Sequence, residues 1–445
     1  MLWRAEWALA VLIFVLPLEK ISYYVGFTLK PYMLLLPIVS IRYWLNVACF
    51  RRHWRWMVLM AFLLGVFMSI GLLTSTAITD PLAAARRLIQ YMLLSALLLA
   101  SILLVKSRQR AQFAVKCLIW TGMLVALYGI FQIVGRFVGF ETEMPLVKYL
   151  SYRPELEAQL RTWTVALGEL VVPRASSTFN DPSLMAGFLI GVLPFPLIGC
   201  LTAAARRQNG KFIAGMLCSG VLLVGIALSF SRSGWVGALF AVAATGYFWR
   251  RVLIRMVRSR EIRVFGLIGL FGLLPVAGFA ELAWQRVAQT FTIQDISTAG
   301  HLTYAMAALK MFAEHPFSGI GIGNYSSYYA THIAGQASIY MSHSAPLTLL
   351  AETGLIGTVI ALIMGRAVFR LFRTALKQIR PESSDYALLT GCISGLIGIL
   401  GGNLGYDYHN QAYIWFIAGL SISVCMLILS DVRLYTQKVR EPTAK

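Results

Sequence analysis

The chain has 445 residues, of which 58% are hydrophobic and only 13% charged, and its formal net charge is +20 at pH 7. Because soluble domains carry about a quarter charged residues, this composition excludes an ordinary soluble protein. Apolar stretches of about 17 to 25 residues, each long enough to cross a ~30 Å hydrocarbon core, recur along the chain and predict a polytopic all-α membrane protein.

The predicted spans follow one another over most of the chain. No small-residue cleavage site follows Leu9 to Leu18, so this segment is predicted to be a first span rather than a signal peptide. We predict about 12 transmembrane helices in a single membrane domain, at 6–19, 27–48, 56–74, 88–105, 113–138, 183–205, 212–229, 234–249, 263–280, 345–365, 385–401 and 411–430.

Basic residues gather in short clusters between the predicted spans, at 51–55, 106–110, 206–207, 250–263 and 366–380. Under the positive-inside rule these loops face the cytoplasm, which places both termini there as well. Attraction to anionic lipid headgroups accounts for the remaining positive charge. The charge distribution therefore indicates membrane lipids as partners and no nucleic acid.

Two loops predicted to face away from the cytoplasm are long, at 139–182 and 281–344. We expect them to contain short helices and to form an outer cap over an active site. Residues 153–168 are predicted to form a short surface helix. Apolar residues at helical spacing in 302–314 predict an amphipathic helix, either on the membrane interface or packed within the cap.

Two arginines, Arg174 and Arg232, lie at the ends of apolar segments on the outer side. An arginine there can simply extend to lipid headgroups, and this structural explanation stands for either one. Positive charge is scarce on that side, however, and a guanidinium binds a phosphate through two N–H groups. Arg232 also lies in a short connection before a helix start, where backbone N–H groups favour anions. The pair predicts a site for a diphosphate.

His343 ends the second long loop, directly before the apolar segment 345–365. A lone histidine is more often structural than catalytic. A neutral imidazole near pH 7 can take a proton from a sugar hydroxyl as that oxygen attacks, so His343 is the candidate base. Asp407, in the last outward loop, is predicted to orient His343 or bind substrate, with a helix-boundary role as the alternative.

A Gly-rich turn at 319–324 resembles a phosphate loop only superficially. It follows His315-Pro316 rather than a strand and lacks the GKS/T ending of a nucleotide site. We expect it to turn the backbone beneath His343.

The sequence predicts no cofactor and no metal. The carboxylates Asp181, Glu352 and Asp407 are scattered, and the outer loops hold no carboxylate cluster suited to magnesium or calcium. The six cysteines lie in or at the ends of apolar segments, which predicts small buried hydrophobes rather than a disulfide framework.

Several motifs together resemble a known family. They are PR at 173–174, STFNDP at 177–182, SRSG at 231–234, EHPFSGIGIGNY at 314–325, SHS at 342–344 and LLAETGLIG at 349–357. Their order and spacing resemble the core of the bacterial O-antigen ligase and Wzy-type polymerase superfamily. The resemblance covers about 170–360 in detail, and the predicted number of spans agrees with that superfamily.

The resemblance implies a periplasmic enzyme of the inner membrane that takes a glycan from undecaprenyl diphosphate. The acceptor is lipid A–core for a ligase, or a second lipid-linked glycan for a polymerase. By the same resemblance, Arg174 and Arg232 bind the diphosphate and His343 activates the acceptor hydroxyl. The implied mechanism is a single displacement with inversion that needs neither a metal nor a nucleotide sugar.

Two departures from the superfamily affect the site. Its members commonly have His-Asn where this chain has His343-Ser344. Many also carry an arginine shortly before the amphipathic helix, where this chain has Gly300-His301. His301 or Arg286 is the candidate replacement for that arginine, and acceptor choice is expected to differ accordingly.

Two other functions fit parts of the sequence. A flippase for lipid-linked sugars would also need basic residues for a diphosphate, but it should bury charges midway through its spans. A membrane scaffold leaves the two long polar loops and the basic residues unexplained. The position of the candidate residues at one face favours transfer chemistry.

Overall fold

The computed structural model describes residues 5–24, 28–44, 78–140, 142, 163–167, 170–257, 277–288, 296–335 and 342–440. The predicted span 56–74 and most of 263–280 lie outside these residues. The described elements are α1 (Ala5–Val15), β1 (Tyr23–Tyr24), β2 (Thr28–Leu29), α2 (Pro31–Trp44), α4 (Pro81–Leu104), α5 (Arg108–Val138), β3 (Thr164–Leu167), β4 (Leu170–Pro173), α8 (Pro182–Val192), α9 (Pro194–Ala205), α10 (Asn209–Leu228), α11 (Arg232–Val257), α13 (Ala277–Ala288), α14 (Ile296–Glu314), α15 (Tyr325–Tyr329), the π-helix η3 (Ala330–Ala334), α16 (Ala345–Leu376), α17 (Ser384–Gly402) and α18 (Ala412–Arg440).

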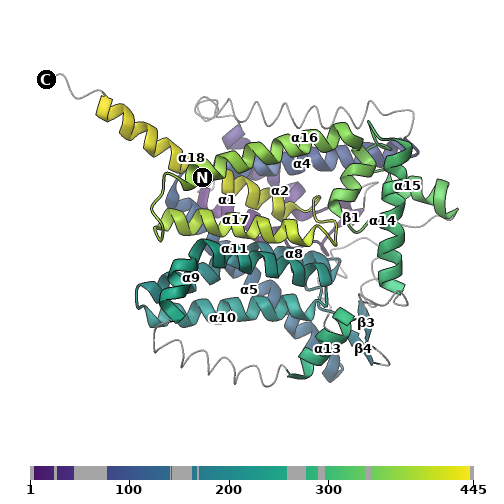
Figure 1. Cartoon of the computed structure of the whole chain (residues 1–445), viewed down its shortest axis with the longest axis horizontal. Coiled ribbons are helices and arrows are strands. Elements are labelled where there is room, and N and C mark those ends of the chain that lie inside the picture. The colour runs from purple at the N-terminus through teal and green to yellow at the C-terminus, as the bar shows by residue number, and fades with distance from the viewer. Residues whose placement is uncertain are drawn as a thin grey trace.

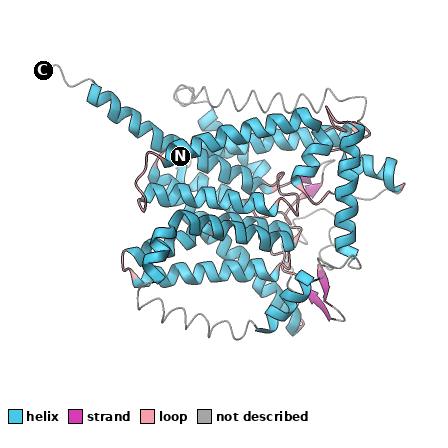
Figure 2. Ribbon diagram, viewed as in Figure 1, coloured by secondary structure: helices cyan, strands magenta, loops and turns pink. Residues whose placement is uncertain are grey.

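The protein is mostly helical, and its long helices run side by side in one bundle (Figures 1 and 2). Seven helical segments in the described part are long and apolar enough to cross a membrane: 81–104, 108–138, 182–205, 209–228, 345–376, 384–402 and 412–431. These segments match predicted spans, which confirms a polytopic membrane protein. α11, with 26 residues, packs along α17 in the same bundle.

Short polar side chains cap the N-termini of several of these helices. Asp80 accepts a hydrogen bond from the backbone N–H of Ala83, and Ser107 accepts one from that of Arg110. Asp181 does the same for Ser183 at the start of α8, and a proline follows it at the first helical position. Such residues satisfy N–H groups that have no partner within the helix, so the local sequence fixes where each helix begins.

Facing glycines allow α11 and α17 to approach closely in the centre of the bundle. A Cβ atom on Gly237 would lie 2.8 Å from the carbonyl oxygen of Gly398, and one on Gly398 would lie 2.9 Å from that of Gly237. Where lipid surrounds the bundle, such small-residue contacts replace the hydrophobic driving force of a soluble core.

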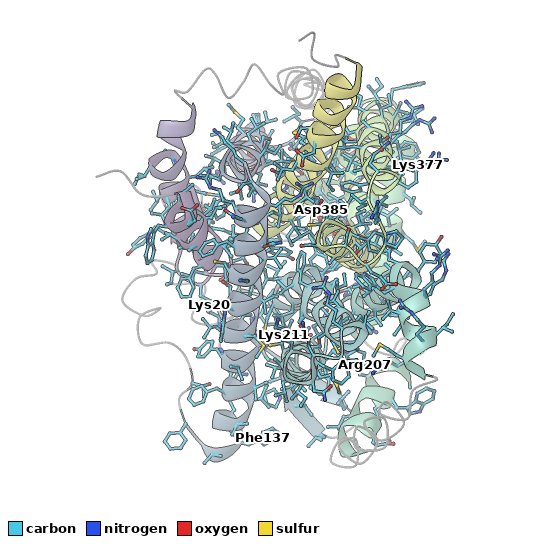
Figure 3. All side chains as sticks on the ribbon, turned by 90° about the vertical axis from the view of Figure 1, so that its left-hand side faces the viewer. Lys20, Phe137, Arg207, Lys211, Lys377 and Asp385 are labelled. Atoms are coloured by element: carbon cyan, nitrogen blue, oxygen red, sulfur yellow. The ribbon has the colours of Figure 1, made fainter. Side chains whose placement is uncertain are left out.

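The two ends of the bundle differ in charge. Basic turns follow α4, α9 and α16, and Figure 3 looks at this end and labels Arg207, Lys211 and Lys377. α1 and α18 reach the same end, because Glu6 pairs with Arg110 at 3.1 Å and Asp431 with Arg108 at 2.5 Å. Both ends of the described chain therefore belong to the basic end.

At the opposite end, α14 lies across the ends of the long helices (Figure 1). Its inner side buries Ala307, Ala308 and Met311 against Ile320 and tyrosines of α15, whereas Leu302, Met306 and Leu309 are exposed. The predicted helix at 302–314 is confirmed. One side of the helix packs on the protein, as expected for a helix within the cap. The other side is an exposed apolar surface, as expected for a helix that lies on the membrane interface.

The described part of the first long loop is a hairpin rather than a helix. β3 and β4 pair antiparallel, with Thr164 opposite Pro173. The predicted surface helix at 153–168 is therefore wrong over 164–167, and its earlier residues lie outside the described part. Val165 and Leu167 are buried while Thr164 and Ala166 are exposed, the alternation of a strand with one buried face.

Candidate functional site

Arg174 leaves β4 and points at the end of α10. Its Nε donates a hydrogen bond of 2.8 Å to the carbonyl oxygen of Ser229, and its Cζ lies 6.0 Å from the centre of the Trp163 ring. Burial lowers the pKa of Arg174, although the nearby Asp181 and Tyr406 oppose that shift. A guanidinium remains charged under such a shift, so Arg174 is a partly buried cation.

Arg232 begins α11 in a serine-rich connection. Ser231 accepts a hydrogen bond from the backbone N–H of Gly234 at 3.2 Å, and its hydroxyl lies 3.0 Å from that of Ser233. The charge of Arg232 acts on Arg174 and disfavours a second positive charge there. Two cations whose charges act on each other, one of them at a helix start, favour an anion beside them.

His343 lies directly before α16, between α14 and the loop that joins α17 to α18. Its ring centre is 4.0 Å from that of His301 and 5.9 Å from those of Tyr304 and Tyr406. Nδ1 is enclosed and has no hydrogen-bond partner among the described residues. Burial lowers the pKa of His343, against the opposing charges of Asp181 and Asp407, which favours the neutral imidazole.

A chain of contacts connects the two arginines with His343. The carbonyl oxygen of Ser229 accepts the hydrogen bond from Arg174. Arg232 lies between Ser229 and Ser233 in the same stretch of main chain. The hydroxyl of Ser233 lies 3.1 Å from that of Tyr408, whose ring is 5.1 Å from that of Tyr406. Since Tyr406 also contacts His343, the three predicted residues lie at one end of the bundle.

Asp407 reaches the His343 loop through two hydroxyls. Its Oδ2 accepts a 3.0 Å hydrogen bond from Thr348, whose hydroxyl lies 2.5 Å from that of Ser342. Oδ1 contacts Nδ1 of His409. Burial alone would raise the pKa of Asp407, but His409, Arg87 and the Thr348 hydrogen bond outweigh burial and lower it.

Asp181 belongs to the same region, which the sequence did not predict. It caps α8, and its charge acts on Arg174, on His343 and on Tyr406, whose hydroxyl hydrogen-bonds to it. Asp181 and Asp407 are far apart in the sequence, but the charges of both act on His343. The signal in the sequence was the Asn180-Asp181-Pro182 helix start directly after Arg174.

The loop between Arg174 and α8 is rich in enclosed polar atoms. The side-chain oxygens of Ser176, Ser177, Thr178 and Asn180 have no hydrogen-bond partner among the described residues. Gln132 of α5 holds the backbone of Ser177 through a 2.7 Å hydrogen bond. Hydroxyl and amide groups of this kind bind the oxygens of sugars and phosphates.

The Gly-rich turn does not offer its N–H groups to a phosphate. Glu352 of α16 accepts hydrogen bonds from the backbone N–H groups of Tyr325, at 3.2 Å, and Gly323. The backbone N–H of Gly321 bonds to the carbonyl oxygen of Glu352 at 3.0 Å, and Arg87 of α4 interacts with the Glu352 charge. The turn therefore packs against α16 and α4, and its expected place beneath His343 stays a prediction.

The two candidate replacements for the superfamily arginine lie in different places. His301, on α14, stacks on His343 with an angle of 28° between the ring planes. Arg286 is buried on α13, which packs beside β3. The first therefore contacts the candidate base.

The site therefore combines two cations, a neutral base and hydroxyl groups. Among the described residues there is no group of three or more histidines, cysteines, aspartates or glutamates that could hold a metal ion. The two cations, the imidazole and the hydroxyl groups suit the transfer of a group away from an anionic leaving group.

Residues 217–362 match the sequence model of a family described as O-antigen ligase. This stretch belongs to the O-antigen ligase domain family, and it contains Arg232 and His343 but not Arg174. No curated protein matches the chain.

Proposed function

We propose that the chain is an integral membrane glycosyltransferase of the bacterial inner membrane, with twelve spans and cytoplasmic termini. It moves a glycan from undecaprenyl diphosphate to an acceptor hydroxyl on the periplasmic face. The leading form is an O-antigen ligase whose acceptor is lipid A–core. The observation that best supports this proposal is that Arg174, Arg232 and His343 lie at the end of the bundle opposite the basic turns. Arg232 and His343 also lie within the family match.

In this proposal the donor diphosphate lies between the two guanidiniums. The loops 139–182 and 281–344 form the cap over it. Arg174 and Arg232 neutralise the diphosphate and stabilise the charge that it gains as it leaves. No metal is needed, because the positive charge comes from side chains. Asp181 limits the excess of positive charge when the donor is absent.

His343 acts as the general base on the acceptor. A ring nitrogen takes the proton of the acceptor hydroxyl while its oxygen forms a bond to the anomeric carbon. The bond from that carbon to the diphosphate oxygen breaks with its electron pair, and undecaprenyl diphosphate leaves. Attack opposite the leaving group inverts the anomeric configuration. Asp407 supports His343 through Thr348 and Ser342.

The first test replaces His343 by Ala and by Asn in protein reconstituted with purified lipid-linked donor and acceptor. Asn tolerates the left-handed backbone that His343 has, with φ of 54°, but it cannot act as a base. We expect both variants to lose transfer by at least about 100-fold, within the range of general base catalysis. Near-normal transfer by His343→Asn would rule out His343 as the base. His332→Ala, which removes a histidine stacked on Tyr328 instead, is the control.

A polymerase of O-antigen or exopolysaccharide repeat units is the alternative. It uses the same donor and a second lipid-linked glycan as acceptor, so the arginines and His343 would keep their roles. The same reconstitution separates the two. Glycan on lipid A–core identifies a ligase, whereas longer lipid-linked chains from donor alone identify a polymerase.

A flippase is less well supported. Two charged side chains, Arg87 and Glu352, do lie in membrane-crossing helices, but they interact with each other and with the Gly-rich turn. These interactions give the two charges a structural role, which weakens the argument that they serve transport. Transport of labelled donor across vesicles by the His343→Asn protein, with no glycan transferred by the wild type, would favour the flippase.

A further inference from the structure

His301 makes the closest ring contact with His343. The two ring centres lie 4.0 Å apart with nearly parallel planes, whereas Tyr304 and Tyr406 are 5.9 Å away at larger angles. His301 comes from α14, a different element from the one that carries His343. The stack therefore depends on how α14 sits across the end of the bundle (Figure 1).

The stack has a geometric consequence for the base. A histidine side chain rotates about two bonds, and a hydrogen bond to Nδ1 normally fixes its ring. The Nδ1 of His343 has no such partner among the described residues. Among the described rings around His343, that of His301 lies closest, and its flat face restricts rotation of the His343 ring.

The stack also has an electrostatic consequence. Two imidazolium cations at this separation repel each other, so a stacked pair accepts a first proton more readily than a second. The charges that act on His343 are those of Asp181 at the start of α8 and Asp407 in the loop after α17, and the rings of Tyr304 on α14 and of Tyr406 lie beside it. Arg174 in turn interacts with Asp181. Both carboxylates favour the protonated form of His343, so a charge on His301 acts against them.

We propose that His301 is a positioning residue for glycan transfer: its imidazole holds the ring of His343 in place and opposes its protonation. This inference rests on the proposed function, because it assumes that His343 is the base. His301 itself touches no reacting atom in this proposal. It acts only through His343.

Three variants of the reconstituted enzyme distinguish the orienting effect of His301 on the His343 ring from its electrostatic effect. His301→Phe keeps a flat ring but cannot carry a proton, and His301→Ala removes the ring. His332→Phe is the matched control, because His332 also stacks on a ring at 4.0 Å, that of Tyr328. Transfer from undecaprenyl diphosphate-linked glycan to lipid A–core is measured between pH 5 and 8.

We expect His301→Ala to lower kcat about tenfold at pH 7.5 while the KM for the donor changes less than about twofold, the pattern of a lost orientation effect. His301→Phe should keep most of kcat at pH 7.5. On acidification it should lose activity at a higher pH than the wild type, by about half a unit or more, because no second charge then opposes protonation of His343. His332→Phe should match the wild type throughout.

A second measurement does not depend on turnover. Histidine NMR spectra, with the His343 signal assigned from its loss in His343→Asn, give the protonation curve of His343 directly. This curve should move to higher pH in His301→Phe. Overlap of both the NMR curves and the kcat values of the His301 variants with the wild type would overturn the proposal. A loss confined to KM would overturn it too, by making His301 a substrate-binding residue. If His343→Asn retains transfer, it is the proposed function that fails.

Discussion

At the scale of single residues, three side chains near the site stand on strained backbone. Ser177, Phe230 and His343 have φ angles of 51°, 47° and 54°, in the left-handed region that costs a non-glycine residue about 1 kcal/mol or more. Ser177 lies three residues after Arg174, Phe230 lies two residues before Arg232, and His343 is itself a candidate site residue. The strained backbone therefore lies at or next to the three candidate site residues, whose side chains must be held in specific directions.

The Asp407 contacts give a residue-scale prediction. Thr348→Val keeps the shape of the side chain but removes the hydroxyl that joins Asp407 to Ser342. We expect kcat to fall about fivefold to tenfold with little change in KM, because a hydrogen bond to a charged group is worth about 1.5–3 kcal/mol and only part of this acts on the His343 loop. Steady-state kinetics in proteoliposomes check this.

Thr348→Ser is the matched control, since it keeps the hydroxyl. Equal kcat for Thr348→Val and the wild type would mean that Asp407 does not support His343 through this route.

The three main candidate site residues could be predicted from the sequence, but the residues that connect them could not. Arg174, Arg232 and His343 were predicted from residue type, position next to apolar segments and motif resemblance. Asp181, Tyr406 and Thr348 were not, because their contacts join segments more than 50 residues apart in the chain. Pairings over such distances depend on how helices pack, which local patterns do not encode.

At the scale of elements, α16 is broken where the Gly-rich turn meets it. Gly354 has φ of 60° and ψ of −160° inside the helix, a conformation open essentially to glycine alone. The break frees the N–H groups of Leu355 and Ile356, which donate to the carbonyl oxygens of Pro316 and Phe317 at 2.8 and 3.1 Å. The motifs at 314–325 and 349–357 thus dock on each other.

Gly354→Ala tests this docking. A Cβ atom there would lie 2.5 Å from Phe317 backbone atoms, in addition to the strain at φ of 60°. We expect a loss of at least about 2–3 kcal/mol in the free energy of unfolding, seen as a lower Tm in detergent. Transfer should fall as well, since α14 leads directly into the docked turn.

Gly365→Ala, in the same helix with open space around its Cβ position, should leave the Tm unchanged or slightly raised. Equal Tm values for the two variants would contradict the docking role of Gly354.

Helix existence was well predicted from apolar runs, whereas helix ends were not. The predicted span 88–105 begins seven residues after the true start of α4 at Pro81. The difference matters because it left Arg87 outside the span. A charged residue lowers the apparent hydropathy of a window, and only the structure reveals its interactions with Glu352 and Asp407.

At the scale of the whole molecule, charge separates the two ends of the bundle. The basic end is tied together by ion pairs such as Arg108 with Asp385 at 2.7 Å. Such exposed pairs add little stability, about 0–1 kcal/mol each. In the proposed topology the excess of basic residues at this end faces the cytoplasm, and the site lies at the other end.

This orientation predicts the reactivity of single cysteines in cells. Arg207→Cys and Lys377→Cys, in turns at the basic end, should react with a membrane-impermeant maleimide only after permeabilisation. Leu404→Cys, 61% exposed at the site end, should react in intact spheroplasts. All three are made in a chain whose native cysteines are replaced by serine or alanine. The reverse pattern would place the site in the cytoplasm and exclude a periplasmic donor.

The distribution of the site over the chain sets the order in which it is made during synthesis. Arg174 and Arg232 have both been synthesised shortly after the midpoint of the polypeptide, His343 follows about a hundred residues later, and Asp407 arrives with the last hairpin, α17 and α18. Because a chain emerges from the ribosome amino end first, the anion-binding part exists before its base is supported. Under the proposed function, the arginines that bind the donor are therefore synthesised before His343 and before the Asp407 contacts that support it.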